Sequence, residues 1–369
     1  MPVDRRAAIL AAAAELFAAQ GFAGTSVDEI GAAVGLTGPA LYRHFPGKDA
    51  LLAEVVMDTV AAFAVDDAGG LEQVVAATVA VALDDPARLA TYVRERHRLV
   101  GSARQALARA ERTLYRPWRT VIRLANPDLA DGDVASRQLA ALTAMSEVAS
   151  RPPALARPRL DRLLVGAMTA VLAVPPLAPP PTPAPPPGGW SLPPGRRDEI
   201  RAAALRLFRQ RGYHGVGMDE IGRAAGVRGP TIYAHYEAKA AILLDVCERA
   251  EARFEAATHA AVAGATSAAD ALDRLAAATL GVVGADRDLA VVAGREEAAL
   301  PTADRRRLAR RRDEVTATWA AVVGAVQPDR PEAEVRAVVD GARPLVVQLA
   351  HGLPVVAAGV PLVRAWCLG

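Results

Sequence analysis

A segment that occurs twice constrains this chain more than any other feature. Residues 35–52 read GLTGPALYRHFPGKDALL, and residues 226–243 read GVRGPTIYAHYEAKAAIL. Tyr42 and Tyr233 are 191 positions apart, and the histidines and lysines that follow them keep the same offset. A constant offset over a whole segment indicates a duplicated structural unit, so the chain is expected to fold as two related halves.

Each copy predicts three short helices and the start of a longer one. In the first copy the expected helices cover residues 5–20, 27–34 and 38–45, and the fourth begins at Lys48. Apolar residues recur at helical spacing along the first, and Gly21 is expected to end it. A capping box at Thr25–Asp28 precedes the second, and Thr37 is the expected cap of the third, with Pro39 in its first turn.

A helix, a short turn containing glycine and a second short helix form a helix-turn-helix pattern, although such pairs also occur as ordinary core packing. Lys48 and Lys239 favour a DNA-binding interpretation, because they are the two lysines among 43 basic residues. A cation at a helix N-terminus opposes the helix dipole, but it suits a site that holds a phosphate. The alternative is a solvated charge or retained ancestry.

The pattern resembles the N-terminal DNA-binding domain of the TetR/AcrR family of bacterial transcriptional regulators, over about 48 residues in each copy. The residues that carry this resemblance in the two copies are Phe17, Gly21, Ile30, Gly35, 41–45, Lys48, Leu51 and Leu52, then Phe208, Gly212, Ile221, Gly226, Tyr233, His235, Lys239 and Leu243. The resemblance implies an all-α fold, a small-molecule pocket in a C-terminal helical domain, dimerisation through the last two helices, and the third helix in the major groove.

The same resemblance implies the DNA-contacting residues. Those expected at phosphates are Tyr42, His44, Lys48, Tyr233, His235 and Lys239, with Thr25 and Ser26 as a cap-and-phosphate pair. Those expected at bases or the groove wall are Thr37, Gly38, Pro39, Ala40, Arg43, Arg228, Gly229, Pro230, Thr231 and Ala234. The tyrosines and histidines could instead pack on neighbouring helices. The second copy departs from the pattern at Val216 and Gly217, which carry no hydroxyl.

Composition agrees with two helical units. The chain has 369 residues, 52% of them hydrophobic and 4% aromatic, which favours an all-α fold rich in alanine, leucine and arginine. Neither a secretory signal nor a membrane span is expected, and two isolated cysteines fit a reduced cytoplasm. No metal-ligand spacing, phosphate loop or catalytic constellation is present in the sequence, so neither a metal, a cofactor nor an enzyme is expected.

The duplication extends beyond the helix-turn-helix. Trp118 and Trp319 are 201 positions apart, as are the Arg-Glu pairs at 94–95 and 295–296. The expected domains are a first helix-turn-helix at 1–48, a first ligand and dimerisation domain at 49–174, a proline-rich linker at 175–195, a second helix-turn-helix at 196–239, and a second ligand and dimerisation domain at 240–369. As polyproline II the linker would span on the order of 60 Å. The two units are therefore expected to pair as a covalent pseudo-dimer, and further homodimerisation is left open.

The sequence suggests a ligand-responsive regulator, a repressor by preference, that binds a double-stranded DNA operator. Net charge is about zero over residues 5–52 and about +4 over residues 196–243, so the two DNA-binding copies are not equivalent. Tyr92, Trp118 and Trp319 are candidate pocket residues, although core packing is the simpler explanation. The C-terminal pattern is similar to that of family members that control lipid or acyl-CoA metabolism. The competing hypothesis is a protein-interaction adaptor in which one or both DNA-binding copies are degenerate.

Overall fold

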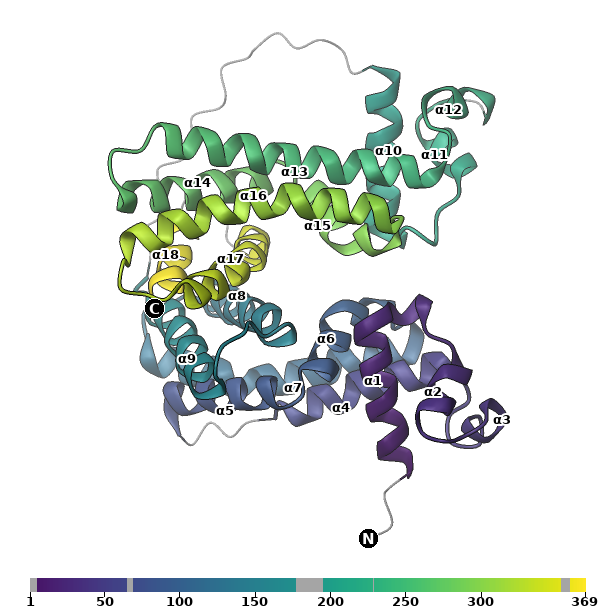
Figure 1. Ribbon diagram of the computed structural model, residues 1–369, viewed down its shortest axis with the longest axis horizontal. Coiled ribbons are helices and arrows are strands. Elements are labelled where there is room, and N and C mark those ends of the chain that lie inside the picture. Colours follow the sequence, from purple (N-terminus) through teal and green to yellow (C-terminus); the bar gives the residue numbers. More distant parts are fainter. Residues whose placement is uncertain (1–4, 65–68, 177–194, 228, 353–358) are drawn as a thin grey trace. The chain divides into compact units, whose positions relative to one another are not determined.

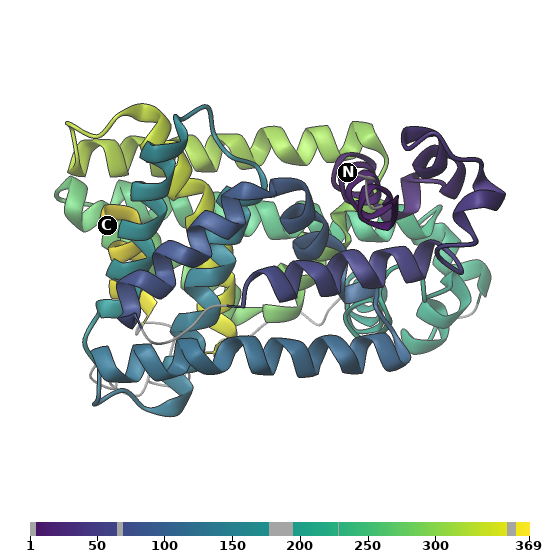
Figure 2. The same ribbon diagram turned by 90° about the horizontal axis from the view of Figure 1, so that it is seen from below.

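The structure is a computed structural model that describes residues 5–64, 69–176, 195–227, 229–352 and 359–369. These residues form helices and connecting turns, with no strand in the described ranges (Figures 1 and 2). The predicted all-α class is therefore confirmed. Arg228 and most of the proline-rich linker lie outside the described residues, as do the side chains of Gly229 and Pro230.

The described residues of the first copy form nine α-helices. They are α1 (Arg5–Gly24), α2 (Val27–Ala33), α3 (Gly38–Leu41), α4 (Lys48–Ala62), α5 (Gly70–Asp84), α6 (Pro86–Glu95), α7 (Gly101–Ala125), α8 (Asp131–Ser150) and α9 (Arg157–Ala173), with a 3₁₀ turn η1 (Arg96–Arg98) before α7. The predicted third helix was too long. Only its first turn is α-helical, and residues 42–44 continue it as a turn.

The second copy repeats the order. Its helices are α10 (Arg196–Arg211), α11 (Met218–Ala224), α12 (Gly229–His235), α13 (Lys239–Ala263), α14 (Ala268–Ala285), α15 (Arg287–Glu296), α16 (Thr302–Val326), α17 (Glu332–Gly352) and α18 (Val360–Leu368), with a 3₁₀ turn η2 (Glu297–Ala299) before α16. Its last helix is shorter than its counterpart, because α18 has 9 residues where α9 has 17.

Glycine sets the turn that ends the first helix of each copy. Gly21 and Gly212 have φ angles of 77° and 73°, in the left-handed region that other residues avoid. Gly21 lies inside α1 as the residue where the helical dihedrals break. The chain therefore changes direction at equivalent points in the two copies, before α2 and α11.

Each helix-turn-helix domain, called a head from here on, has its own apolar core. Ile9, Phe17, Ile30, Leu41 and Phe45 are fully buried in the first head. The matching cluster in the second head includes Ile200, Phe208, Ile221, Ile232 and Tyr236. These positions hold α3 and α12 against the helices before them. Of the described helices, α1 is the one that is long and apolar enough to cross a membrane, and its apolar face is the one buried in the first head.

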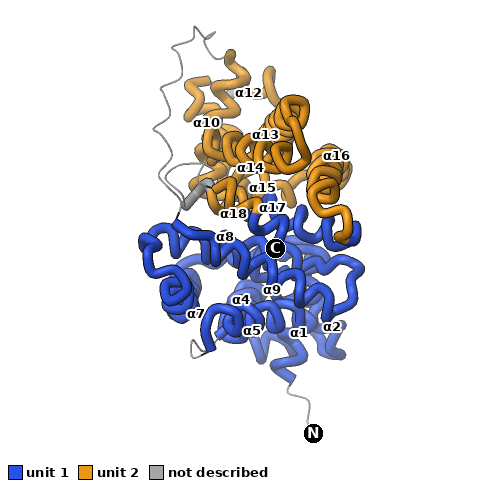
Figure 3. The backbone as a smooth tube through the Cα atoms, turned by 90° about the vertical axis from the view of Figure 1, so that its left-hand side faces the viewer, with its two compact units in different colours: residues 1–176, 331–345, 365–369 blue, residues 177–330, 346–364 orange. Residues whose placement is uncertain are grey.

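The chain divides into two compact units (Figure 3). Unit 1 comprises residues 1–176, 331–345 and 365–369, and unit 2 comprises residues 177–330 and 346–364. Unit 1 thus contains the first copy together with two segments from the end of the second. Within unit 1, Arg159 of α9 pairs with Glu334 of α17, and the indole of Trp366 donates to the carbonyl of Val338 at 2.7 Å.

One ion pair occurs in both copies with its charges exchanged. In the first copy Arg96 of η1 lies 3.4 Å from Glu111 of α7. In the second copy the residues 201 positions later are Glu297 of η2 and Arg312 of α16, 2.5 Å apart. Exchanging α7 and α16 between the copies would place like charges together at both sites. The copies are therefore not interchangeable at this pair.

We expect a charge-swap cycle to show that this pair stabilises the first copy. Glu111→Arg places two guanidinium groups together and should lower the midpoint of the urea transition. Adding Arg96→Glu rebuilds the pair in reverse and should restore most of the loss. Because Arg96 is 41% exposed, solvent screens the pair and the coupling should be at most about 1 kcal/mol. Additive single effects, measured by urea unfolding of all four proteins, would contradict the coupling.

Candidate nucleic-acid interface

The recognition helix of each head presents an aromatic side chain to solvent. Tyr42 and Tyr233 are 54% and 52% exposed, and they are the two large aromatic residues with this degree of exposure among the described positions. Thr37, Arg43 and His44 are exposed beside Tyr42. In each head the helix that carries this tyrosine packs on the core through isoleucine or leucine, so the opposite face is left open to a partner.

The structure gives three of the predicted residues a role inside the first head. The hydroxyl of Thr25 is buried and donates to the carbonyl of Gly21 at 3.0 Å, so it does not lie at the surface. The capping box is formed by Ser26 and Glu29, not by Thr25 and Asp28 as predicted. Gly38 is buried, and a Cβ there would lie 2.1 Å from the carboxylate of Asp28. Its smallness serves packing on α2.

The remaining predicted groove residues are distributed unequally. Pro39 is exposed and Ala40 is half-buried in the first head, whereas Thr231 and Ala234 are both exposed in the second. His235 is half-buried. The two heads thus present different surfaces around the same tyrosine. Their predicted base and phosphate contacts stay predictions.

The two lysines brace the turn between the first two helices of each head. The ammonium of Lys48, at the start of α4, donates to the carbonyls of Phe22 and Thr25 at 2.7 and 2.8 Å. It also lies 4.3 Å from the centre of the Phe22 ring. These contacts explain a cation at a helix N-terminus without any phosphate, and they leave one of its three N–H donors for another partner.

Lys239 repeats this arrangement in the second head. It donates to the carbonyls of Tyr213 and Val216 at 2.8 and 2.7 Å and lies 4.2 Å from the centre of the Tyr213 ring. Burial lowers the pKa of Lys239. The lysine strut is therefore a property of the duplicated unit, present in both heads at the same 191-residue offset.

A buried glutamate holds the opposite side of the same turn. Glu95 of α6 is 7% exposed and accepts a hydrogen bond from the amide of Phe22 at 3.1 Å. Glu296 of α15 is equally buried and accepts from the amide of Tyr213 at 3.2 Å. Since α6 and α15 lie outside the heads, each glutamate ties a head to the helical domain that follows it. Sequence spacing paired Glu95 with Glu296 but did not indicate this contact.

A third device fixes the end of each recognition helix. Arg6 donates to the carbonyl of His44 at 3.0 Å, lies 4.3 Å from the centre of the Phe45 ring and pairs with Glu54. The second head repeats it with Arg197, Tyr236 and Asp245. The exit of the recognition helix is thereby attached to the first and fourth helices of the head. Each head therefore positions its recognition element rigidly.

Some arginines of the second head are already engaged in ion pairs. Arg211 pairs with Glu220 at 2.8 Å, and its guanidinium holds the pKa of that carboxyl at about 2. Arg201 is largely buried and pairs with Asp198 and Asp245. The number of arginines in this head therefore overstates how many are available to phosphates.

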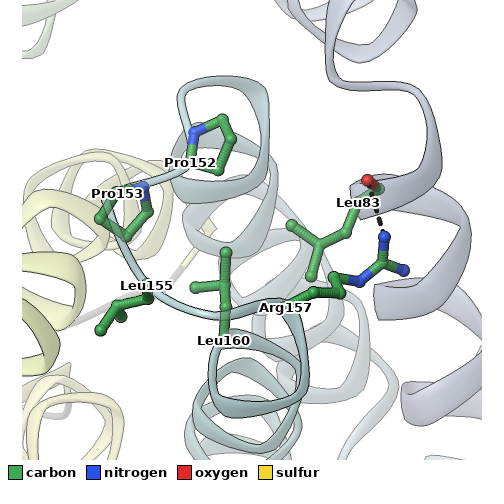
Figure 4. Close-up of a pocket in the computed structure, with 6 residues that line it drawn as sticks. All are labelled: Leu83, Pro152, Pro153, Leu155, Arg157 and Leu160. Carbon is green, nitrogen blue, oxygen red and sulfur yellow. Dashed lines mark hydrogen bonds between the residues drawn. The ribbon is translucent and has the colours of Figure 1, made fainter.

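The candidate pocket residues belong to the interior of the helical domains. Trp118 and Trp319 are 1% and 6% exposed. The hydroxyl of Tyr92 donates to Glu111 at 2.7 Å, and burial raises its pKa. A separate cavity of about 320 Å³ lies elsewhere in unit 1 (Figure 4). Its lining comprises Leu83, Pro152, Pro153, Leu155, Arg157 and Leu160.

None of the three candidates lines this cavity, and its single charged residue is already engaged. Arg157 donates to the carbonyl of Leu83 at 2.9 Å, as Figure 4 shows, and pairs with Asp84 and Asp161. The cavity therefore offers an apolar wall without a free cation. No group of three or more histidine, cysteine or carboxylate side chains suited to a metal ion occurs among the described residues.

Comparison with known families identifies both heads. The family model described as bacterial regulatory proteins, tetR family, matches residues 9–55 and 200–246. The two matched ranges contain the lysine struts, Lys48 and Lys239, and most of the apolar core of each head. Both heads therefore belong to the TetR family of bacterial regulatory proteins.

Known relatives match this chain over limited stretches. The HTH-type transcriptional activator FasR of Mycolicibacterium smegmatis is 44% identical over 54 residues, which is 15% of this chain and 25% of FasR. A tetR-family regulatory protein from Rhodococcus RHA1 is 20% identical, with a TM-score of 0.42 over 47% of this chain and 96% of that protein. AibR, solved with isovaleryl coenzyme A and operator DNA, is 19% identical, with a TM-score of 0.38 over 43% of this chain and 95% of AibR.

Replacing the lysine strut should cost stability in the first head. Lys48→Met leaves the carbonyls of Phe22 and Thr25 without their donor, so we expect a loss of roughly 1–2 kcal/mol and a lower thermal midpoint. Lys239→Met is the matched variant in the second head. If either variant keeps its full thermal stability and loses only DNA affinity, the lysine is a phosphate ligand and the strut interpretation is wrong.

Proposed function

We propose that this chain is a DNA-binding transcriptional regulator that uses both heads. The observation that carries the proposal is the pair of half-exposed tyrosines, Tyr42 and Tyr233, at equivalent points of two braced helix-turn-helix domains. A tyrosine combines an apolar ring with a polar hydroxyl at its tip, which suits it to a surface that contacts a partner. A tyrosine can instead pack its ring on the sugar-phosphate backbone and donate its hydroxyl to a phosphate.

We propose further that the two copies act as one covalent pseudo-dimer. Unit 1 supports this arrangement, because its α8 and α9 occur together with residues 331–345 and 365–369 from the last helices of the second copy. The Arg159–Glu334 pair and the close approach of Gly369 to Gly166, with 3.4 Å between a Cβ built at Gly166 and the Gly369 carbonyl carbon, belong to this packing. Pairing of the last two helices is what the family resemblance implies for a dimer.

The operator of such a pseudo-dimer should be asymmetric. A symmetric dimer presents one surface twice and reads a palindrome. Here Thr37, Ala40 and Arg43 of the first head correspond to Arg228, Thr231 and Ala234 of the second. Because the residues around the shared tyrosine differ in size and charge, the two half-sites should differ in sequence while the phosphate contacts remain alike.

Effector control fits the connection between each head and its helical domain. Glu95 and Glu296 transmit any movement of α6 or α15 to the turn that carries the second helix of the head. A small molecule that favours one position of α6 would thus alter head spacing and DNA affinity. We propose repression as the default output, with an apolar effector of the lipid or acyl-CoA class. FasR, a relative matched over 54 residues, is described as a transcriptional activator, so a reporter assay must decide the sign.

The same proposal places the protein in the cytoplasm, where it would bind DNA and catalyse no reaction. A buried thiol agrees with a reducing compartment: burial raises the pKa of Cys247 to about 12, which keeps it protonated and unreactive. An adaptor function is the second candidate. The observation that favours it is the near-zero net charge of the first head, which weakens attraction to phosphates.

The stoichiometry of the DNA complex tests the pseudo-dimer. We expect one chain to protect a two-part asymmetric site in DNA from upstream of its own gene, as measured by light scattering of the complex with a footprint alongside. Two chains on a palindrome would show that one kind of head reads DNA and the other completes the scaffold. Absence of protection at every salt concentration would favour the adaptor.

Removing one tyrosine at a time tests whether both heads bind. Tyr42→Ala and Tyr233→Ala should each weaken operator affinity, by about tenfold for the loss of roughly 1.4 kcal/mol of contact energy. Both side chains are half-exposed, so neither change should lower thermal stability appreciably. A variant that binds the operator with unchanged affinity would show that its head makes no DNA contact.

A further inference from the structure

An arginine stripe on α7 is not explained by either head. The stripe consists of Arg109, Arg112, Arg116, Arg119 and Arg123. Their spacing of three and four residues places them on one face of the helix, along roughly 21 Å of its length. All five are exposed. Glu111 is the one acidic residue in α7, and it is engaged with Tyr92 and Arg96.

Acidic side chains neutralise almost none of the positive charge of the stripe. Arg123 pairs with Asp131 at its far end. The guanidinium groups of Arg109, Arg112, Arg116 and Arg119 form no ion pair with any described residue. Four like charges at helical neighbour spacing repel one another, and the fold of the described chain offers nothing that offsets this cost.

The second copy shows how the same helix can use its arginines for structure. α16 also contains six arginines, but they are confined to residues 305–312. Arg307, Arg311 and Arg312 pair with glutamates of α13 and η2. Positions 112, 116 and 119 of the stripe correspond to Asp313, Ala317 and Ala320. Of the five stripe positions, 109 alone has an arginine at its counterpart, Arg310, so the stripe as a whole is specific to the first copy.

The chemistry of the stripe fits a regularly charged polyanion. Guanidinium groups bind phosphates through paired N–H donors and remain charged at every physiological pH. Residues exposed between the arginines, such as Thr113 and Thr120, are small and polar. A protein partner would instead be anchored by apolar or aromatic side chains at the centre of the contact. Nucleic acid, which carries a charge at every backbone step, matches a row of cations.

The stripe lies away from the recognition helix of its own unit. Leu107, near the start of α7, packs in the first head's cluster, and the helix then runs toward α9 (Figure 1). The base pairs beneath α3 are therefore not the ones the stripe would reach. We propose that the α7 arginine stripe binds the sugar-phosphate backbone of a second segment of double-stranded DNA, without sequence preference.

The full-length protein with Arg112→Gln, Arg116→Gln and Arg119→Gln tests this second site. Binding to a duplex without operator sequence should become less salt-dependent. The slope of log binding constant against log salt concentration should fall in magnitude by about 2.7 for three phosphate contacts. A control variant with Arg162→Gln, Arg287→Gln and Arg306→Gln removes the same charge from three scattered exposed positions. It should change the slope far less. Equal changes in the two variants would reduce the effect to net charge and overturn the proposal.

A bridging assay separates the stripe from the heads. An immobilised operator duplex should retain a second, labelled duplex through the wild-type protein but not through the stripe variant, while both proteins bind the operator equally. A Tyr42→Ala, Tyr233→Ala protein should keep stripe-dependent binding to DNA even if the heads prove not to bind. Capture of the second duplex by the stripe variant would overturn the proposal, as would tighter binding of polyglutamate than of DNA by the wild type.

Discussion

The rest of the structure depends on the hydrogen bonds that a lysine and a glutamate make around the turn between the first two helices of each head. These contacts are together called the clasp. The ammonium group of a lysine in the fourth helix donates hydrogen bonds to two carbonyls of this turn. The carboxylate of a buried glutamate in the sixth helix accepts a hydrogen bond from an amide of the same turn. The turn has a left-handed glycine at Gly21 or Gly212, so its polar groups point away from helical partners. Without the clasp these groups would be unsatisfied, and the first head would keep its polar links to α6 only through Thr91 and Arg94, which donate to the carbonyls of Ala14 and Ala18 in α1.

Duplication preserved this framework and let the surfaces diverge. The struts of Lys48 and Lys239 agree within about a tenth of an ångström in their carbonyl distances. By contrast, the pair between η1 and α7 has its charges exchanged in the second copy. Interactions that position the recognition helix are thus repeated, whereas those that face solvent or the neighbouring helix differ. Such a chain can keep two rigid heads while each acquires its own partner.

Much of the fold could be predicted from periodicity, and the errors have physical causes. Helix bounds in the first copy were mostly predicted within a few residues because apolar spacing and Pro or Gly punctuation are local signals. The third helix was predicted too long, since the amides of Arg43 and His44 donate to carbonyls three residues back, as in a turn, rather than four. The lysines were singled out by their rarity as phosphate contacts, which stays a prediction. The contacts of Lys48 with Phe22 and Thr25 involve carbonyls more than twenty residues away, which no local pattern encodes.

The sequence by itself determined the duplication, the all-helical class and the identity of both heads, because a fixed 191-residue offset and the turn chemistry of glycine and proline are readable along the chain. Only the tertiary structure decided which charges are free. Arg201 and Arg211 count as positive in any sum, yet ion pairs with neighbouring helices occupy them. Arg112, Arg116 and Arg119 carry the same charge and form no ion pair within the described part of the chain. Whether a guanidinium can meet a phosphate depends on what folds beside it, and that is a property of three-dimensional packing.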